Sequence, residues 1–150
     1  MTIRYNENDT NIANGILKLD GNGLVPSDRL PAGLSGFYMD KQLYYVGELF
    51  TLTSSQYWKP LEDIYIINVE FELGAAPTGT GQTVVKLIRN NDANDVLYVA
   101  TFVSGDLTYL YTTNQLISAG DKVSLSITET TTGFHGSDLN VSIQYAKNQD

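Results

Sequence analysis

A single histidine, His135, and the absence of cysteine set narrow limits on catalysis in this 150-residue sequence. A Ser-His or Cys-His mechanism needs an imidazole base beside its nucleophile, so any such site would have to use His135. This residue stands in a glycine-flanked segment, GFHGSD at positions 133–138. Because such loops lie at the surface, we expect an exposed loop histidine and not a catalytic base.

Paired carboxylates would offer another route to hydrolysis, as the acid and base of a glycosidase. The candidates are Glu62, Asp63, Glu70 and Glu72. Glu70 and Glu72 alternate with apolar residues, which is typical of the solvated face of a strand. We therefore expect no enzymatic activity and assign no catalytic residue.

Two glycine-rich segments match ion-binding loops only in part. Residues 20–23, DGNG, match the start of a calcium loop, but its further oxygen ligand and distal glutamate do not follow. Residues 74–81, GAAPTGTG, lack the Lys-Ser/Thr pair of a phosphate loop. Both segments are typical of turns, and the sequence predicts no metal site and no cofactor.

Aromatic residues are the best candidates for binding, since the chain has ten Tyr, five Phe and one Trp. Tyr and Trp offer rigid apolar rings with a polar group, which suits sugars and protein surfaces. Residues 54–60, SSQYWKP, form the most loop-like aromatic cluster. The candidate receptor or glycan contacts are Tyr57, Trp58, Tyr109 and Tyr111, with Tyr44 and Tyr45 as further residues to watch. Ordinary packing in a core or between subunits is the alternative for each ring.

The charge balance argues against two classes of partner. Nine Lys and Arg face 17 Asp and Glu, for a formal net charge of −8, and the basic residues are scattered. Binding to nucleic acid or an anionic membrane needs clustered cations, so neither is expected. No apolar run approaches the ~20 residues of a membrane span, so we expect no membrane insertion, and no signal peptide is visible.

Short alternating segments after residue 37 predict an all-β fold. Residues 64–73 alternate most clearly, with one face formed by Ile67, Val69, Phe71 and Leu73. Residues 43–53 are strand-like, with a bulge or bend expected at Gly47. Near the C-terminus, Val123, Leu125 and Ile127, and then Leu139, Val141, Ile143 and Tyr145, also alternate with polar residues.

No window sustains a helical period, and residues 113–120, TNQLISAG, hold one helical turn at most. Seven or eight strands with turn signals between them predict an antiparallel β-sandwich, jelly-roll-like, over residues 37–150. Residues 1–36 are expected to form an extended N-terminal arm and connector.

The connector holds a short apolar segment at residues 14–31, NGILKLDGNGLVPSDRLP. Its glycines and prolines make it too interrupted for a helix, and it is too apolar for a free linker. We expect it to bury its apolar side chains in other chains, as attachment contacts through Ile16, Leu17, Leu19, Leu24, Val25 and Leu30.

Two stretches resemble phage fibre proteins. Residues 13–32 resemble a connector of such proteins, matched here by Gly15, Leu19, Asp20, Gly23, Val25, Pro26, Leu30 and Pro31. The GAAPTG turn, AGD before a strand and GSDL before the last strand resemble a β-sandwich domain at the ends of phage fibres. The resemblance implies a homotrimer on the virion surface, joined by its arm to another virion protein.

The resemblance leaves two positions on the virion open. A short tail-fibre or receptor-binding tip, contacting a host glycan or protein, is slightly favoured because aromatic residues are abundant. A tail-fibre protein is usually much longer, with an attachment domain and a shaft that this sequence does not show. A capsid decoration or head-fibre protein, bound to the capsid lattice through the arm, is therefore the alternative.

Overall fold

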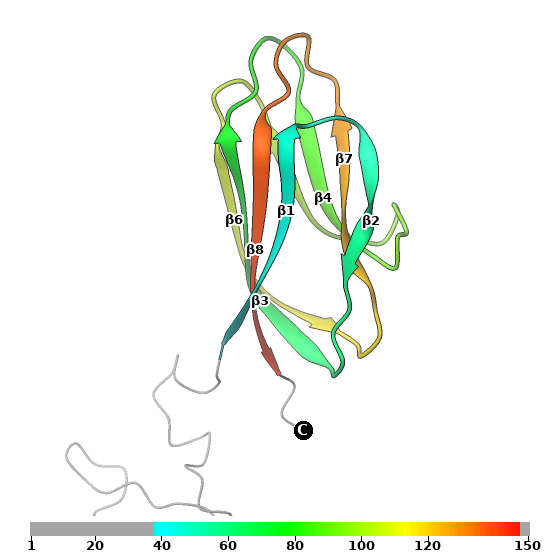
Figure 1. Cartoon of the computed structure of the whole chain (residues 1–150). Coiled ribbons are helices and arrows are strands. Elements are labelled where there is room, and N and C mark those ends of the chain that lie inside the picture. Colours follow the sequence, from blue (N-terminus) through cyan, green and yellow to red (C-terminus); the bar gives the residue numbers. More distant parts are fainter. Residues whose placement is uncertain (1–37, 148–150) are drawn as a thin grey trace, which may run out of the picture. The chain divides into compact units, whose positions relative to one another are not determined.

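The computed structural model describes residues 38–147, which form eight strands and no helix. Two four-stranded sheets pack face to face as a sandwich (Figure 1). The strands are β1 (Met39–Glu48), β2 (Leu52–Trp58), β3 (Ile64–Ala75), β4 (Thr83–Arg89), β5 (Val96–Phe102), β6 (Thr108–Ile117), β7 (Val123–Glu129) and β8 (Ser137–Lys147).

The strand order is that of a jelly roll. One sheet has the order β1-β8-β3-β6 and the other β2-β7-β4-β5, and every pairing is antiparallel. Except for the β4–β5 hairpin, each strand is followed by a strand of the opposite sheet. Such an eight-stranded, two-sheet arrangement is the jelly-roll form of the antiparallel sandwich. The predicted fold class is confirmed.

Alternate residues of the strands fill the space between the sheets. In β3, Val69, Phe71 and Leu73 are at most 3% exposed, while Glu70 and Glu72 lie on the outer face. Each fully buried aliphatic or Phe side chain stabilises the fold by about 1.5–3 kcal/mol relative to exposure. The alternation predicted for the last two strands also holds, since the core includes Val123, Leu125, Ile127, Leu139, Val141 and Ile143.

One residue predicted to face the core does not. The register of β3 shifts between Ile66 and Asn68 in its pairings with both β6 and β8. Ile64 and Ile66 are buried before this bulge and Val69 after it, while Ile67 is only half-buried. A bulge adds one residue to a strand and so reverses which positions point inward. Strict alternation therefore gave the wrong side for Ile67.

The segment predicted as one strand over residues 43–53 is two strands in different sheets. Between β1 and β2 the chain crosses the sandwich, and Leu49 is fully buried at the crossing. Gly47 has a φ of 94°, and the β1–β8 register shifts between Tyr45 and Glu48. The bulge predicted at Gly47 is confirmed. The crossing was not predicted, because the apolar pattern of the sequence continues through it.

Two further segments are strands against expectation. Residues 54–58, predicted as a loop, belong to β2, and residues 114–117, predicted as one helical turn at most, belong to β6. Half-buried and exposed positions alternate along β6 up to Ile117, which is buried. Pairing of Ile117 with Ile64 of β3 extends the ladder to that point. Sheet pairing therefore outweighs the polar composition of these segments.

Candidate functional site

The four aromatic residues predicted as receptor contacts lie on two opposite edges of the sandwich. Tyr57 and Trp58 belong to β2, the outer strand of one sheet, and Tyr109 and Tyr111 belong to β6, the outer strand of the other. β2 and β6 stand on opposite sides of the domain (Figure 1). The structure therefore does not bring the four rings into one surface.

Tyr109 helps to close the edge between β5 and β6. Its hydroxyl lies 2.5 Å from the carbonyl oxygen of Thr101 and 3.1 Å from Oδ2 of Asp106, so it can donate to either. Its ring meets Phe102 edge-on, with 5.0 Å between centroids. Burial, and then the hydrogen bond and negative charge of Asp106, raise the pKa of Tyr109.

Tyr111 acts in the same way along this edge. Its hydroxyl donates to the carbonyl oxygen of Val99 in β5. Its ring packs edge-on against Phe71 at 6.2 Å and lies 5.9 Å from the ring of Tyr98. Tyr109 and Tyr111 thus join the two sheets where no backbone ladder connects them, which is a packing role.

The two aromatic residues of β2 differ in exposure. Trp58 is half-buried and packs on Tyr145 of β8 at 4.8 Å between ring centroids. Tyr57 is 48% exposed, and the ammonium of Lys122 lies 4.7 Å from its ring centroid in a cation–π contact. Of the four candidates, Tyr57 is therefore the one that offers a ring to a partner.

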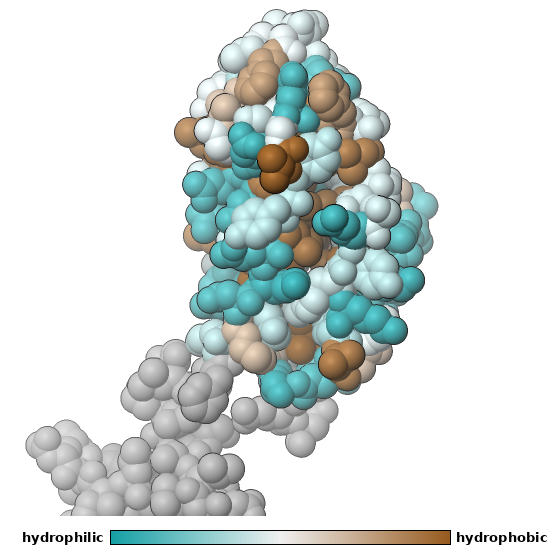
Figure 2. Space-filling view, in the orientation of Figure 1, coloured by the Kyte–Doolittle hydropathy of each residue, from teal (hydrophilic) through white to brown (hydrophobic). Residues whose placement is uncertain are grey.

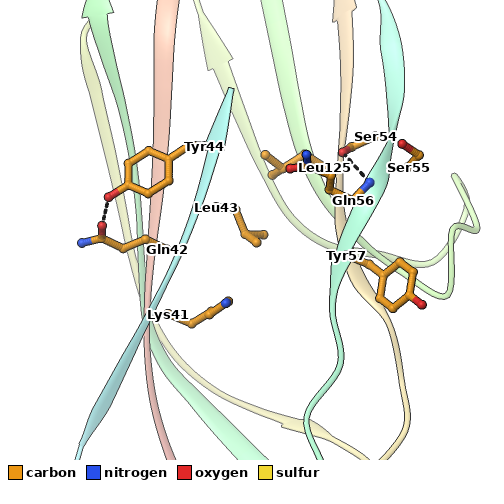
Figure 3. A pocket seen from close by; sticks show the side chains of 9 residues that line it. All are labelled: Lys41, Gln42, Leu43, Tyr44, Ser54, Ser55, Gln56, Tyr57 and Leu125. Atoms are coloured by element: carbon orange, nitrogen blue, oxygen red, sulfur yellow. Dashed lines mark hydrogen bonds between the residues drawn. The ribbon is translucent and has the colours of Figure 1, made fainter. Parts of the chain in front are cut away.

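A groove separates the edge strands β1 and β2, on the side of the sandwich opposite the β5–β6 edge. Figure 3 shows Lys41 and Leu43 pointing from β1 toward β2. The groove has a volume of about 430 Å³. The residues that line it are Lys41, Gln42, Leu43 and Tyr44 of β1, Ser54, Ser55, Gln56 and Tyr57 of β2, and Leu125 of β7.

A bulge in β2 forms one wall of this groove. Thr53 pairs with Ser126 of β7 and Tyr57 pairs with Ser124, so three residues of β2 stand opposite the single residue Leu125. The two extra residues interrupt the ladder at this point, as bulges do at sheet edges and binding sites. The backbone N–H of Gln56 bonds to Oγ of Ser54 at 3.1 Å, which holds the bulge. No sequence signal marked this bulge.

The chemistry of the groove is that of a polar binding site. Leu43 and Leu125 give it an apolar part, and Ser54 and Gln56 point a hydroxyl and an amide group into it. The side chains of the other polar lining residues, Gln42, Tyr44, Ser55 and Tyr57, point away from it (Figure 3). Lys41 supplies the single charge, and no carboxylate is among the lining residues. Small-molecule sites combine apolar surface with a few placed polar groups in this way. The sequence did not single out Lys41, since an isolated lysine carries no signal.

His135 is packed and not exposed, so that prediction was wrong. Its side chain is 18% exposed, and its Nδ1 lies 3.0 Å from the carbonyl oxygen of Leu49. Oxygens of Glu48 and Glu129 lie 3.5 Å from Nδ1 and Nε2, respectively, and Phe50 meets the ring edge-on at 5.4 Å. The β7–β8 loop thus folds onto the crossing between β1 and β2. These contacts hold three segments together.

One face of the described domain carries no large hydrophobic patch. Hydrophobic residues form separate spots among hydrophilic ones on the face seen in Figure 2. Among residues 38–147, no group of three or more His, Asp or Glu side chains is placed to hold a metal ion. The same range contains no helix that could span a membrane. The apolar residues predicted for attachment, Ile16, Leu17, Leu19, Leu24, Val25 and Leu30, lie outside the described residues.

Comparison with known proteins gives distant likenesses alone. No protein-family model matches the sequence, and no curated protein matches it. One similar solved structure, described as Bacillus endospore appendages that form disulfide-linked pili, is 11% identical and has a TM-score of 0.45, covering 75% of this chain and 91% of that one. Another, the cyanophage Pam1 capsid asymmetric unit, is 13% identical with a TM-score of 0.47, covering 74% and 84%. The fold assignment rests on the strand order itself.

Proposed function

We propose that this chain is a non-enzymatic structural protein of a phage virion, displayed on the surface as a short trimeric knob. The jelly-roll domain is the displayed part, and residues 1–36 connect it to another virion protein. The likeness of residues 13–32 to a fibre connector supports this assignment. Function comes from sites and not from the fold, so the surface of the domain must supply the rest of the argument.

The groove between β1 and β2 carries our preference for a receptor-binding tip. It lies open at an edge of the domain, Ser54 and Gln56 bring hydroxyl and amide groups to it, and the exposed ring of Tyr57 lies beside it on the outer side of β2 (Figure 3). These are the groups with which proteins bind sugars and polar surfaces. Trp58, Tyr109 and Tyr111 we assign to packing, because their rings contact other strands.

Saturable adhesion is the test of this function. Purified full-length protein at micromolar concentration should bind host cells and block adsorption of the phage, and Tyr57→Ala should weaken both effects. Val99→Ala on the opposite edge is the matched control, since it is 39% exposed and distant from the groove. Binding that does not saturate, or that both variants weaken equally, would contradict the receptor-binding role.

Trimerisation through the connector is a separate part of the proposal. Its apolar residues are the contacts that we assign to neighbouring chains. Leu19→Ser with Leu24→Ser should convert a trimer into monomers in analytical ultracentrifugation, because each removes an apolar contact in every copy. A wild-type chain that sediments as a monomer at micromolar concentration would rule out this role.

A further inference from the structure

We propose that the groove between β1 and β2 binds an acidic saccharide, a sugar carrying a carboxylate, with Lys41 as the group that recognises its charge. This inference rests on the proposed adhesive function and narrows it to a class of ligand. Three observations support this inference: the difference between the two lateral edges of the sandwich, the charges of the lining residues, and the groups around Lys41.

The two lateral edges of the sandwich are built differently. At the β5–β6 edge, the hydroxyls of Tyr109 and Tyr111 bond to main-chain carbonyls of the facing strand, which ties the sheets together. At the β1–β2 edge, the bulge at residues 54–56 moves β2 away from β7 and leaves a groove of about 430 Å³. That volume lies within the roughly 300–1,000 Å³ typical of small-molecule sites. The second edge therefore has room for a ligand.

The charge of the lining favours an anion. The chain has a formal net charge of −8, yet the groove is lined by one ammonium group and by no carboxylate. Within residues 38–147, Lys41 forms no ion pair with a carboxylate, whereas Arg89 and Lys147 both do. A lysine in a groove free of acidic groups is a suitable partner for a ligand carboxylate, because charge-assisted hydrogen bonds are the strong ones.

The groups around Lys41 suit the rest of a sugar. Ser54 and Gln56 point from β2 into the groove (Figure 3) and provide donors and acceptors along one wall, as pyranose hydroxyls require. The ring of Tyr57 points away from β1 (Figure 3), is 48% exposed and has Lys122 beside it, so this aromatic surface and positive charge lie on the outer side of β2. A cation and neutral polar groups facing into the groove together match an acidic saccharide better than an apolar peptide.

The test is a titration of the full-length protein with trigalacturonate, with neutral galactotriose as the matched ligand. We expect trigalacturonate to bind, and amide chemical-shift changes to map to β1 and to residues 54–57. Lys41→Gln should lower its affinity by about tenfold or more, which corresponds to ~1.4 kcal/mol. Lys86→Gln is the control, because Lys86 lies on β4 and does not line the groove. It should leave the affinity for trigalacturonate unchanged. Thermal unfolding of each variant checks that the fold is intact.

The outcomes separate this inference from the function on which it rests. Equal binding of both ligands, no effect of Lys41→Gln, or shift changes elsewhere would overturn the acidic class while leaving adhesion in place. Saturable binding to host cells without binding of either saccharide would also overturn it and would favour a protein receptor. Absence of both saccharide and cell binding would remove the proposed receptor-binding function as well.

Discussion

Replacing Tyr109 by Phe tests directly whether this residue packs the sandwich or contacts a receptor. The change removes the hydroxyl that lies near the carbonyl of Thr101 and the carboxylate of Asp106. It keeps the ring that packs edge-on against Phe102. A typical hydrogen bond contributes about 0.5–1.5 kcal/mol net, and about 1.5–3 kcal/mol when one partner is charged. For this half-buried hydroxyl we expect a loss of about 1–2 kcal/mol.

That loss should be visible in thermal unfolding followed by circular dichroism. In a domain near 100 residues, about 1 kcal/mol lowers Tm by roughly 4 °C, so Tyr109→Phe should unfold about 4–8 °C below the wild type. Tyr57→Phe is the matched control. Its ring is 48% exposed and its hydroxyl has no hydrogen-bond partner among residues 38–147, so we expect a change within about 0.5 kcal/mol.

The pH dependence gives the same prediction a second readout. The pKa of Tyr109 is raised in the folded protein, so the folded state holds this proton more tightly than the unfolded state. The stabilisation is then fully present below the ordinary tyrosine pKa of about 10 and is lost as pH rises through the folded pKa. The difference in Tm between wild type and Tyr109→Phe should be constant near neutral pH and should narrow above about pH 10.

Host-cell binding decides between the two roles of Tyr109. If it serves packing, Tyr109→Phe should bind cells as the wild type does at temperatures where both are folded. Unchanged Tm combined with lost cell binding would refute this reasoning and restore Tyr109 as a receptor contact.

Two further predictions concern the loop before β4 and the contact between β1 and the start of β8. Gly81→Ala should lower the free energy of unfolding in urea by more than about 3 kcal/mol, because a Cβ there would lie 2.4 Å from the carbonyl oxygen of Thr130. Gly105→Ala is the control, since this glycine has a similar positive φ in open space, and it should lower the free energy of unfolding by only about 1–2 kcal/mol. Equal losses for the two variants would contradict this account. The N–H of Gly47 donates to the carboxylate of Asp138 and lowers its pKa, so Asp138→Ala should be less stable than the wild type at pH 7. The difference should narrow as pH falls through the folded pKa, and part of it should remain because Ala is strained at the φ of 56° found here. A difference that stays constant as the pH is lowered would contradict this account.

Much of the fold could be predicted because alternation and turn residues are local signals. Val69, Phe71 and Leu73 were placed correctly for this reason. The errors arose where the backbone departs from regular geometry. The bulge at Ile67 and the crossing after Gly47 change which side a residue faces. No residue type indicated the bulge at Ile67. Gly47 indicated a bulge, but nothing near it indicated that the chain passes to the other sheet.

The candidate site was harder to predict than the fold. Tyr57 was chosen for its aromatic ring and is exposed, but Tyr109 was chosen on the same ground and is packed. Residue type cannot separate these cases, because burial depends on which strands meet across the sandwich. Lys41 and His135 could not be singled out for the same reason. Lys41 faces residues of β2, and His135 contacts the β1–β2 crossing, and the sequence around each residue does not show these neighbours.

The most direct test of the proposed virion role is the copy number of this chain in purified phage particles, measured by quantitative mass spectrometry. A receptor-binding tip should be present in a multiple of three, on the order of ten trimers per particle, as closed tail symmetry requires. A number near or above a hundred trimers would contradict the receptor-binding position and favour capsid decoration. Absence of the chain from the particles would contradict a virion role altogether.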